Sequence, residues 1–331
     1  YTLDKEQPDF IFSNNPPNNV YGFNYFGGTT VPLKDGRVKT FEELTENKDF
    51  KKIGFLRMDV DGLGYIFSKG LRGIKKDMQG QDYIVDRSNF SNYATLSGLL
   101  DLFFSGYINK IREKEEYRND VFIIYSGGDD LFAVGYWNKI IMFAYEVQKE
   151  FKKFTGRTDI TVSAGIEIVG PKFPAGKAAI IAGEAEDKAK HFENFKNKKK
   201  NALCIFGIPV NWDEEFPKIL KWKDNLVSWV KDKLISKGLL MKLLTYYESY
   251  ADNKAKNSMD PIKYPIDHSW KWQIAYNLGR RASSTSNEQT CACLDEIKKL
   301  IFTEIQEQRF RFEAFAIALR WAELELRQLK N

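Results

Sequence analysis

The sequence predicts an α+β fold, in which a ferredoxin-like βαββαβ sheet domain is followed by an all-helical domain. Strand and helix patterns alternate between residues 51 and 210, and helical spacing of apolar residues dominates from 211 onward. At 331 residues, with 43% hydrophobic and 29% charged residues, the chain is long enough for two folded domains. We expect a β-rich connector (1–50), the sheet domain (51–210) and the helical domain (211–331).

The connector is rich in turn residues, including the runs NNPPNN and FGGTT. Asp35-Gly36 lies between short β-like runs that contain Val31 and Val38, which predicts the tip of a hairpin. No residue pattern in this segment indicates chemistry.

The sheet domain has the predicted order β-α-β-β-α-β-α-β. A strand at 52–60 (KIGFLRMDV) precedes a helix at 94–114, where apolar residues recur every three or four positions. Two strands, VFIIY and LFAVGY, flank the turn GGDD closely enough to form a hairpin. A helix at 138–154, a strand at 160–169, a helix starting at 175 and a final strand at 201–207 complete the domain.

The last third of the chain is predicted to be helical throughout. Its apolar positions follow helical spacing, and Pro261, Pro265 and the run SSTSNEQ mark breaks between helices. The aromatic residues at these positions are more typical of a hydrophobic core than of a ligand site.

Composition limits the setting of the protein. No apolar run approaches the ~20 residues that span a bilayer, so we expect no membrane partner. The chain begins without Met or a signal peptide, and its three cysteines show no zinc-binding spacing, so we expect a reducing, cytoplasmic setting. The net charge of +5 permits nucleic-acid contact without requiring it, and the basic run KNKKKN is consistent with a solvated loop.

Two acidic spots carry the functional prediction. Asp59 and Asp61 end the first strand (MDVDGLG), and Asp129 and Asp130 lie on the GGDD hairpin. In a βαββαβ sheet the first strand lies beside this hairpin, so three or four carboxylates meet although they are 70 residues apart. Such a cluster needs a divalent cation, and carboxylate oxygens favour Mg²⁺ or Mn²⁺ in a two-metal site.

The neighbouring glycines fit a phosphate-binding role. Gly62 and Gly64 follow the first strand where a short helix begins, and Gly127 and Gly128 leave room over the hairpin for a base or ribose. Each feature also has a simpler interpretation, since Asp61 could be a plain helix cap and the GG turn an ordinary hairpin. The two acidic spots together make the metal site the better hypothesis.

These motifs resemble a known superfamily. A strand ending in DVDG, a GGDD hairpin and a later TVSAGI strand are similar to the palm of GGDEF-type diguanylate cyclases, class III nucleotidyl cyclases and family B polymerases. SGGDDLFAVG together with MDVDGLG, ATLSGLLDLFF and a helical C-terminal domain most resembles the large polymerase-like subunit of type III CRISPR effector complexes, in its Csm-type (III-A) branch.

The resemblance implies that the chain converts ATP into cyclic oligoadenylates when the complex binds target RNA. Asp59 and Asp129 would then be metal ligands, Asp130 a third ligand or support, and the carbonyl of Val60 a further ligand. The segment AEDKAK implies Lys190 as a phosphate-binding lysine. Ser126 and Ser163 would border the nucleotide.

The resemblance also implies partners. Full-length members carry an HD nuclease domain, a first palm and a linker, none of which has a counterpart in this sequence, so we expect no deoxyribonuclease centre here. The missing first palm would be the second of the two palms that together form the ATP site. The other effector subunits would bind the chain, among them the small helical subunits, and guide and target RNA would be bound through the complex.

Two alternatives remain open. The chain could be a stand-alone diguanylate or other nucleotidyl cyclase, although the helical domain and GGDD in place of GGDEF argue against this. It could also be a scaffold with a vestigial palm, although four intact aspartates would be costly to keep without a cation.

Overall fold

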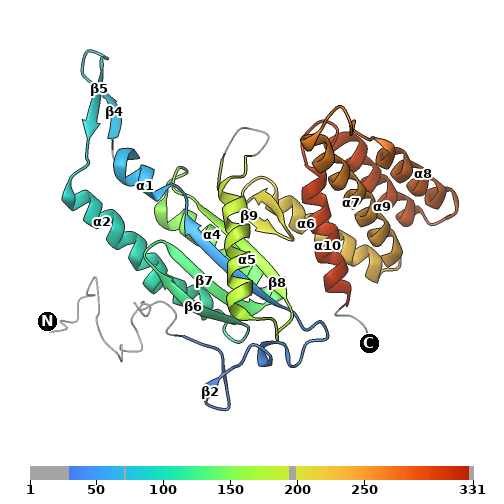
Figure 1. The fold of residues 1–331 in the computed structure, drawn as a ribbon, viewed down its shortest axis with the longest axis horizontal. Helices are drawn as coiled ribbons and strands as arrows, with labels where there is room; N and C mark the ends of the chain where they lie inside the picture. The colour runs from blue at the N-terminus through green and yellow to red at the C-terminus, as the bar shows by residue number, and fades with distance from the viewer. Residues whose placement is uncertain (1–29, 71, 194–198, 328–331) are drawn as a thin grey trace.

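The central element of the structure is a six-stranded sheet with helices on both of its faces (Figure 1). The computed structural model describes residues 30–70, 72–193 and 199–327 of the chain. The strands lie in the order β10-β9-β8-β3-β7-β6. Their bounds are β3 Ile53–Val60, β6 Val121–Gly127, β7 Asp130–Tyr136, β8 Val162–Val169, β9 Ala202–Ile205 and β10 Ile208–Asn211.

Strand β3 lies between β7 and β8 and is antiparallel to both. Its apolar side chains are buried on both faces, because helices cover the sheet on each side. The order β8-β3-β7-β6 is that of a ferredoxin-like sheet, which confirms the predicted α+β fold class. Strand β9 then adds to β8 in parallel.

The sheet has one more strand than the sequence predicts. The strand expected at 201–207 ends at Ile205, because Phe206 and Gly207 both have positive φ (53° and 76°) and turn the chain back. Residues Ile208–Asn211 then pair antiparallel with β9 as β10. Positive φ at both loop residues is the geometry of a tight hairpin turn, and the aromatic residue in the first position conceals it in the sequence.

Two helical connections cover one face of the sheet. They are α2 (Phe90–Asp101), which continues through a π-helical stretch (Leu102–Tyr107) into α3 (Ile108–Arg112), and α4 (Trp137–Thr155). Leu56 and Met58 of β3 share a hydrophobic core with these helices. The expected helices at 94–114 and 138–154 are therefore confirmed.

Helix α5 (Ala175–Lys190) covers the opposite face. Ile53 and Phe55 of β3 pack there against Ala178 and Ala182. A ferredoxin-like βαββαβ unit has its helices on one face of the sheet. Helix α5 lies on the other face because it follows this unit and connects the parallel pair β8 and β9. Since side chains alternate along β3, Arg57 and Asp59 lie on the same face as Phe55, beneath α5.

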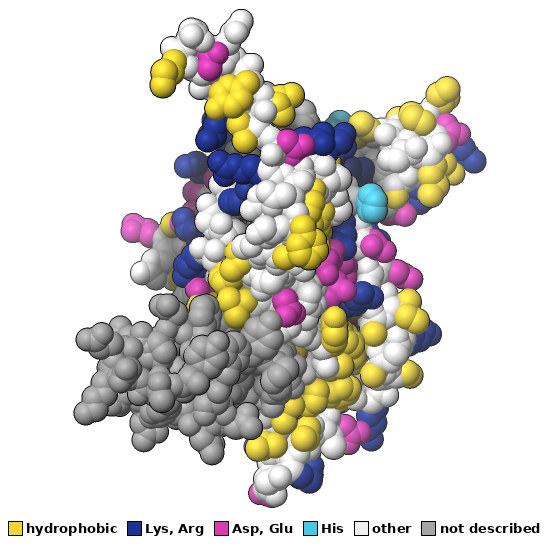
Figure 2. All heavy atoms as spheres, turned by 90° about the vertical axis from the view of Figure 1, so that its left-hand side faces the viewer, with side chains coloured by type: hydrophobic (Ala, Val, Ile, Leu, Met, Phe, Trp, Pro, Cys, Tyr) yellow, Lys and Arg dark blue, Asp and Glu magenta, His cyan; other side chains and the backbone are white. Residues whose placement is uncertain are grey.

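A hairpin that the sequence analysis missed protrudes beside the sheet (Figure 1). It follows α1 (Leu63–Tyr65) and a π-helical turn (Ile66–Gly70), and consists of β4 (Arg72–Lys76) and β5 (Asp82–Asp86). It forms the top of the molecule in Figure 2, with hydrophobic side chains on its surface. Tyr83 and Ile84 are exposed there.

The C-terminal part is helical, as predicted. Its helices are α6 Phe216–Lys231, α7 Lys237–Met259, α8 Ser269–Ser283, α9 Glu288–Lys299 and α10 Phe312–Arg327, with a π-helical stretch at Leu300–Glu304. Pro261 and Pro265 lie in the break between α7 and α8, as expected. The hydrophobic core continues from the sheet into these helices, and Trp321 Nε1 of α10 donates to Asn138 Oδ1 of α4 over 2.9 Å.

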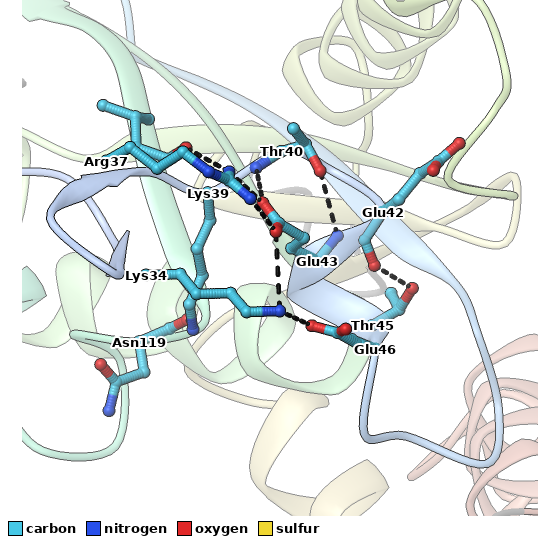
Figure 3. Close-up of polar contacts among 10 residues, drawn as sticks. Lys34, Arg37, Lys39, Thr40, Glu42, Glu43, Thr45, Glu46 and Asn119 are labelled. Atoms are coloured by element: carbon cyan, nitrogen blue, oxygen red, sulfur yellow. Dashed lines mark hydrogen bonds and ion pairs between the residues drawn. The ribbon is translucent and has the colours of Figure 1, made fainter.

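The described part of the connector contains the expected hairpin, with β1 (Leu33–Lys34) and β2 (Arg37–Val38) on either side of Asp35-Gly36. Both turn residues have positive φ. Ion pairs then tie it to the short helix Glu43–Thr45 (Figure 3). Arg37 and Thr40 bond the Glu43 carboxylate, which lowers the pKa of Glu43 to about 2. Lys39 donates to the carbonyl of Asn119 and so joins the connector to the sheet domain.

Two further observations bear on the setting of the protein. Within the described part of the chain, no helix combines the length and apolar character that crossing a bilayer requires. All three cysteines are described, and each is free.

Candidate metal and nucleotide site

The structure brings Asp59, Asp129 and Asp130 together at one end of the sheet. Asp59 is the penultimate residue of β3, and Asp130, the first residue of β7, lies directly opposite it. Asp129 lies in the turn before β7. Each residue offers one carboxylate oxygen, and these oxygens all lie within 4.8 Å of one another. The two acidic spots therefore meet as expected through three carboxylates, and Asp61 is not part of this group.

The hairpin turn is built to carry these aspartates. Gly127 and Asp130 close a two-residue loop, and Gly128 takes positive φ (64°), as the first residue of a type II′ turn must. A side chain on Gly128 would meet no atom within 4 Å, so the space above the turn is open. Asp101 Oδ1 at the end of α2 accepts from the Gly128 amide at 3.2 Å and from Ser105 Oγ at 2.6 Å. Asp101 thus fixes the turn to the helix beneath it.

The acidic cluster is electrostatically strained. Partial burial and the neighbouring Asp59 raise the pKa of Asp129 above its ordinary value. Burial, with the hydrogen bond and charge of Asp59, raises the pKa of Asp130 to about 6. Burial first, and then the like charges held close together, favour the protonated form of these carboxyl groups.

The donor set of the cluster fits a hard divalent cation. Carboxylate oxygens are ligands that Mg²⁺ and Mn²⁺ prefer, and a bound cation would offset the burial and the neighbouring carboxylates that raise the pKa values of Asp129 and Asp130. Val60, whose carbonyl the resemblance adds to the ligands, ends β3 opposite Val162. Its role as a ligand stays a prediction.

Lys190, the last residue of α5, reaches the acidic cluster from above the sheet. Its Nζ forms an ion pair with Asp59 Oδ2 and another, of 2.7 Å, with Glu186 Oε1. Burial alone would lower the pKa of Lys190, but the two carboxylates outweigh it and raise the pKa above its ordinary value. A charged ammonium is therefore held at the site where the sequence analysis places a phosphate-binding lysine.

The loop after β3 has a second cation beside it. Gly62 has positive φ (66°), and a β-carbon there would lie 3.3 Å from Lys200 Nζ. Gly64 has open space around it. The contact of both glycines with phosphate stays a prediction. Lys200 belongs to the basic run that was interpreted as a solvated loop; Lys196 and Lys198 of that run lie outside the described residues.

Asp61 does not act as the helix cap considered in the sequence analysis. Its carboxylate is buried, and Oδ2 accepts from Thr161 Oγ1 at 2.7 Å and from the Asn201 amide at 2.9 Å. Gly62 takes the position before the helix, without a side-chain cap. Asp61 therefore ties the loop after β3 to the segments before β8 and β9, and burial raises its pKa.

Two predicted nucleotide contacts lie in the protein interior. Ser126 is buried, and its hydroxyl donates to the carbonyl of Phe104 at 2.5 Å. Ser163 is fully buried, and its Oγ accepts from the Ala202 amide at 3.4 Å. In these positions the two serines support the hairpin and the β8–β9 pair, and contact with a nucleotide stays untested for both.

Several site residues escaped the sequence analysis. Asp101 comes from a helix end that no local motif marks, while Glu186 and Lys200 lie in the segments AEDKAK and KNKKKN without having been assigned a role in the site. Arg57 precedes Asp59 by two residues on the same strand face, a spacing that could have indicated it. A pocket of about 220 Å³ adjoins the acidic cluster and is lined by Arg57, Tyr125, Asp130, Leu131, Phe132 and Ala179.

The family model and the similar proteins found by comparison all point to Cas10 proteins. The model of the Cas10/Cmr2 family's second palm domain matches residues 52–204. The CRISPR system single-strand-specific deoxyribonuclease Cas10/Csm1 (subtype III-A) of Methanocaldococcus jannaschii is 36% identical over 214 residues, which are 60% of this chain and 24% of that protein. Its namesake from Streptococcus thermophilus is 30% identical over 274 residues, 80% of this chain and 32% of that protein.

Solved structures share the fold. Csm1 of T. onnurineus superimposes with a TM-score of 0.64 at 23% identity, covering 95% of this chain and 43% of that one. A Csm1–Csm4 cassette in complex with pppApApA gives a TM-score of 0.64 at 22% identity, covering 92% of this chain and 41% of that one. The chain thus corresponds to less than half of each relative.

Proposed function

Because the chain belongs to the Cas10/Csm1 family of type III-A CRISPR proteins, we propose that its palm makes cyclic oligoadenylates from ATP. The synthesis depends on divalent cations and is activated when the effector complex binds target RNA. The observation that carries this proposal is the convergence of Asp59, Asp129 and Asp130 within 4.8 Å at the end of the sheet.

The chain's own residues have distinct roles in this proposal. Asp59, Asp129 and Asp130, with the carbonyl of Val60, hold Mg²⁺ or Mn²⁺; when bound there, such ions supply activation of a 3′-hydroxyl and neutralisation of the triphosphate. Lys190 places a positive charge beside the phosphates. The open positions at Gly64 and Gly128 leave room for the nucleotide.

Adenine nucleotides are the substrate class that the related structures favour. Csm1–Csm4 cassettes with this fold are described in complexes with one ATP, with cA3 and with cA4. These same structures support Csm4 as a partner of this chain. The other effector subunits, guide and target RNA, a second palm and a cytoplasmic setting belong to the same proposal. The two relatives are named as deoxyribonucleases, but this chain matches only 24% and 32% of their length. Our proposal therefore concerns the palm alone.

Mass spectrometry of the products tests the proposal. The chain would be assembled with the other palm, Csm4 and the remaining subunits, and incubated with ATP and Mn²⁺ with or without target RNA. We expect cyclic oligoadenylates only with RNA, and none from the Asp129→Ala/Asp130→Ala variant. A product from GTP instead would support a diguanylate-type cyclase. No product from an RNA-bound complex would leave a scaffold with a vestigial palm.

A further inference from the structure

A buried carboxylate lies next to the acidic cluster without belonging to it. Glu186 of α5 is only 5% exposed. Its position is set by Gly165 of β8, because a β-carbon there would lie 2.1 Å from the Glu186 amide nitrogen and 2.3 Å from the Ala182 carbonyl. The helix therefore rests directly on the strand, and Glu186 has little freedom to move away from the site.

Glu186 pairs with two cations at once. Its Oε1 lies 2.7 Å from Lys190 Nζ, one helical turn along α5, and its Oε2 lies 3.4 Å from Arg57 Nε. Gly183 gives the arginine its space, since a β-carbon there would lie 3.0 Å from Arg57 Nη1. A buried carboxylate is tolerated when it is paired in this way, and the arrangement orients both cations.

Lys190 has two carboxylate partners, and one of them is a proposed cation ligand. It pairs with Asp59 as well as with Glu186. A divalent ion at the acidic cluster competes with the ammonium for the oxygens of Asp59. An ammonium that loses its only anion in a partly buried position carries a desolvation cost. A second carboxylate removes that cost, because the ammonium stays paired when Asp59 turns to the ion.

We propose that Glu186 is a positioning residue that keeps Lys190 paired beside the acidic cluster when a divalent cation takes over Asp59. This inference rests on the proposed function, because it assumes that the cluster binds Mg²⁺ or Mn²⁺. Through Glu186, Lys190 changes from a counter-ion of Asp59 to a charge available for phosphate. Glu186 itself contacts neither the ion nor the nucleotide.

A double-mutant cycle on Mn²⁺ affinity tests this role without relying on activity. The dissociation constant would be measured by electron spin resonance, without nucleotide, for the full chain and for Glu186→Gln, Lys190→Met and the double variant. We expect Glu186→Gln to weaken Mn²⁺ binding by about threefold to tenfold, the scale of coupling within one ion-pair network. Lys190→Met should strengthen binding, because nothing then competes for Asp59.

The effect of Glu186→Gln in the Lys190→Met background shows whether Glu186 acts through Lys190. A role through Lys190 predicts that the effect shrinks below about twofold there. An equal effect in both backgrounds would show that Glu186 acts only as a nearby negative charge, and no effect in either would show a purely structural role; both results overturn the inference. Circular dichroism of each variant in EDTA checks folding, and Lys190→Met alone still tests the competition if Glu186→Gln unfolds.

Asp59→Asn separates this inference from the proposed function. If Mn²⁺ binding by the wild-type chain is lost in Asp59→Asn, the cluster is the binding site and the cycle tests Glu186 alone. If Asp59→Asn binds as the wild type does, the proposed metal site is overturned, and the role of Glu186 with it.

Discussion

Asp59 and Asp130 lie directly opposite each other in the antiparallel register of β3 and β7. Like charges at opposed positions of a sheet are destabilising, and Asp129 adds a third carboxylate beside them. Lys190 offsets part of this charge. This opposition of charges costs stability, and it links the sheet register to the proposed cation site.

Replacing Asp130 with Asn should stabilise the cation-free protein. The change keeps the shape of the side chain and removes one of two opposed charges, so the free energy of unfolding should rise by up to about 1 kcal/mol. Thermal melting in EDTA measures this, with Asp187→Asn on the exposed side of α5 as a control that should change little. A lower melting temperature for Asp130→Asn would contradict the electrostatic account of the cluster.

The difference in stability between the wild-type protein and Asp130→Asn should depend on pH. The pKa of Asp130 is raised from 3.8 to about 6, so the folded state holds its proton more tightly than the unfolded state does. The contribution of Asp130 to the free energy of unfolding is therefore fully present below pH 4 and is lost as the pH rises through about 6. In EDTA, the stabilising effect of Asp130→Asn should be small near pH 4, grow up to about pH 6 and then level off. A difference that is constant over this range would exclude the raised pKa.

Lys200 should contribute to nucleotide binding, because its ammonium lies over Gly62 in the loop after β3. We expect Lys200→Ala to weaken binding of AMPPNP with Mn²⁺ by about fivefold, the scale of one partly exposed ion pair. Isothermal titration calorimetry measures this. Lys199→Ala is the matched control, since Lys199 is exposed and pairs with Glu193 at 3.7 Å. Equal effects of both substitutions would indicate a general charge effect and no specific role for Lys200.

Gly165 should tolerate no side chain. A β-carbon there would approach the backbone of α5 to 2.1 Å, so Gly165→Ala must push the helix away from β8. We expect a loss of about 3 kcal/mol in the free energy of unfolding, measured by urea denaturation. Gly170→Ala is the control, because a β-carbon at that position would have no atom within 4 Å. Similar losses for both variants would show that glycine matters here only for chain flexibility.

The sheet order and the meeting of the acidic residues could be predicted because both follow from local patterns. The apolar strand ending in Asp59 and the GGDD turn are readable in the sequence, and the ferredoxin-like order then places them side by side. The turn at Phe206 and the hairpin after Gly70 lack the usual turn dipeptides, so β10 and the β4–β5 hairpin were missed.

The surroundings of the cluster depend on tertiary contacts that no short pattern encodes. Glu186 resembles any helical glutamate until α5 is placed on Gly165, and Asp101 resembles a helix end until it accepts from Gly128. Ser126 and Ser163 are the reverse case. Their positions beside the motifs suggested contact with the nucleotide, but the strand pleat turns both side chains inward.

A crystal structure of the chain with Mn²⁺ and AMPPNP tests the central claim most directly. Anomalous scattering locates the manganese without assumptions about its ligands. We predict a peak within coordination distance of Asp59 and of at least one carboxylate of the GGDD turn, with Lys190 released from Asp59 and still paired with Glu186. Manganese bound elsewhere, with the ion pair between Lys190 and Asp59 intact, would contradict the assignment of this cluster as the catalytic metal site.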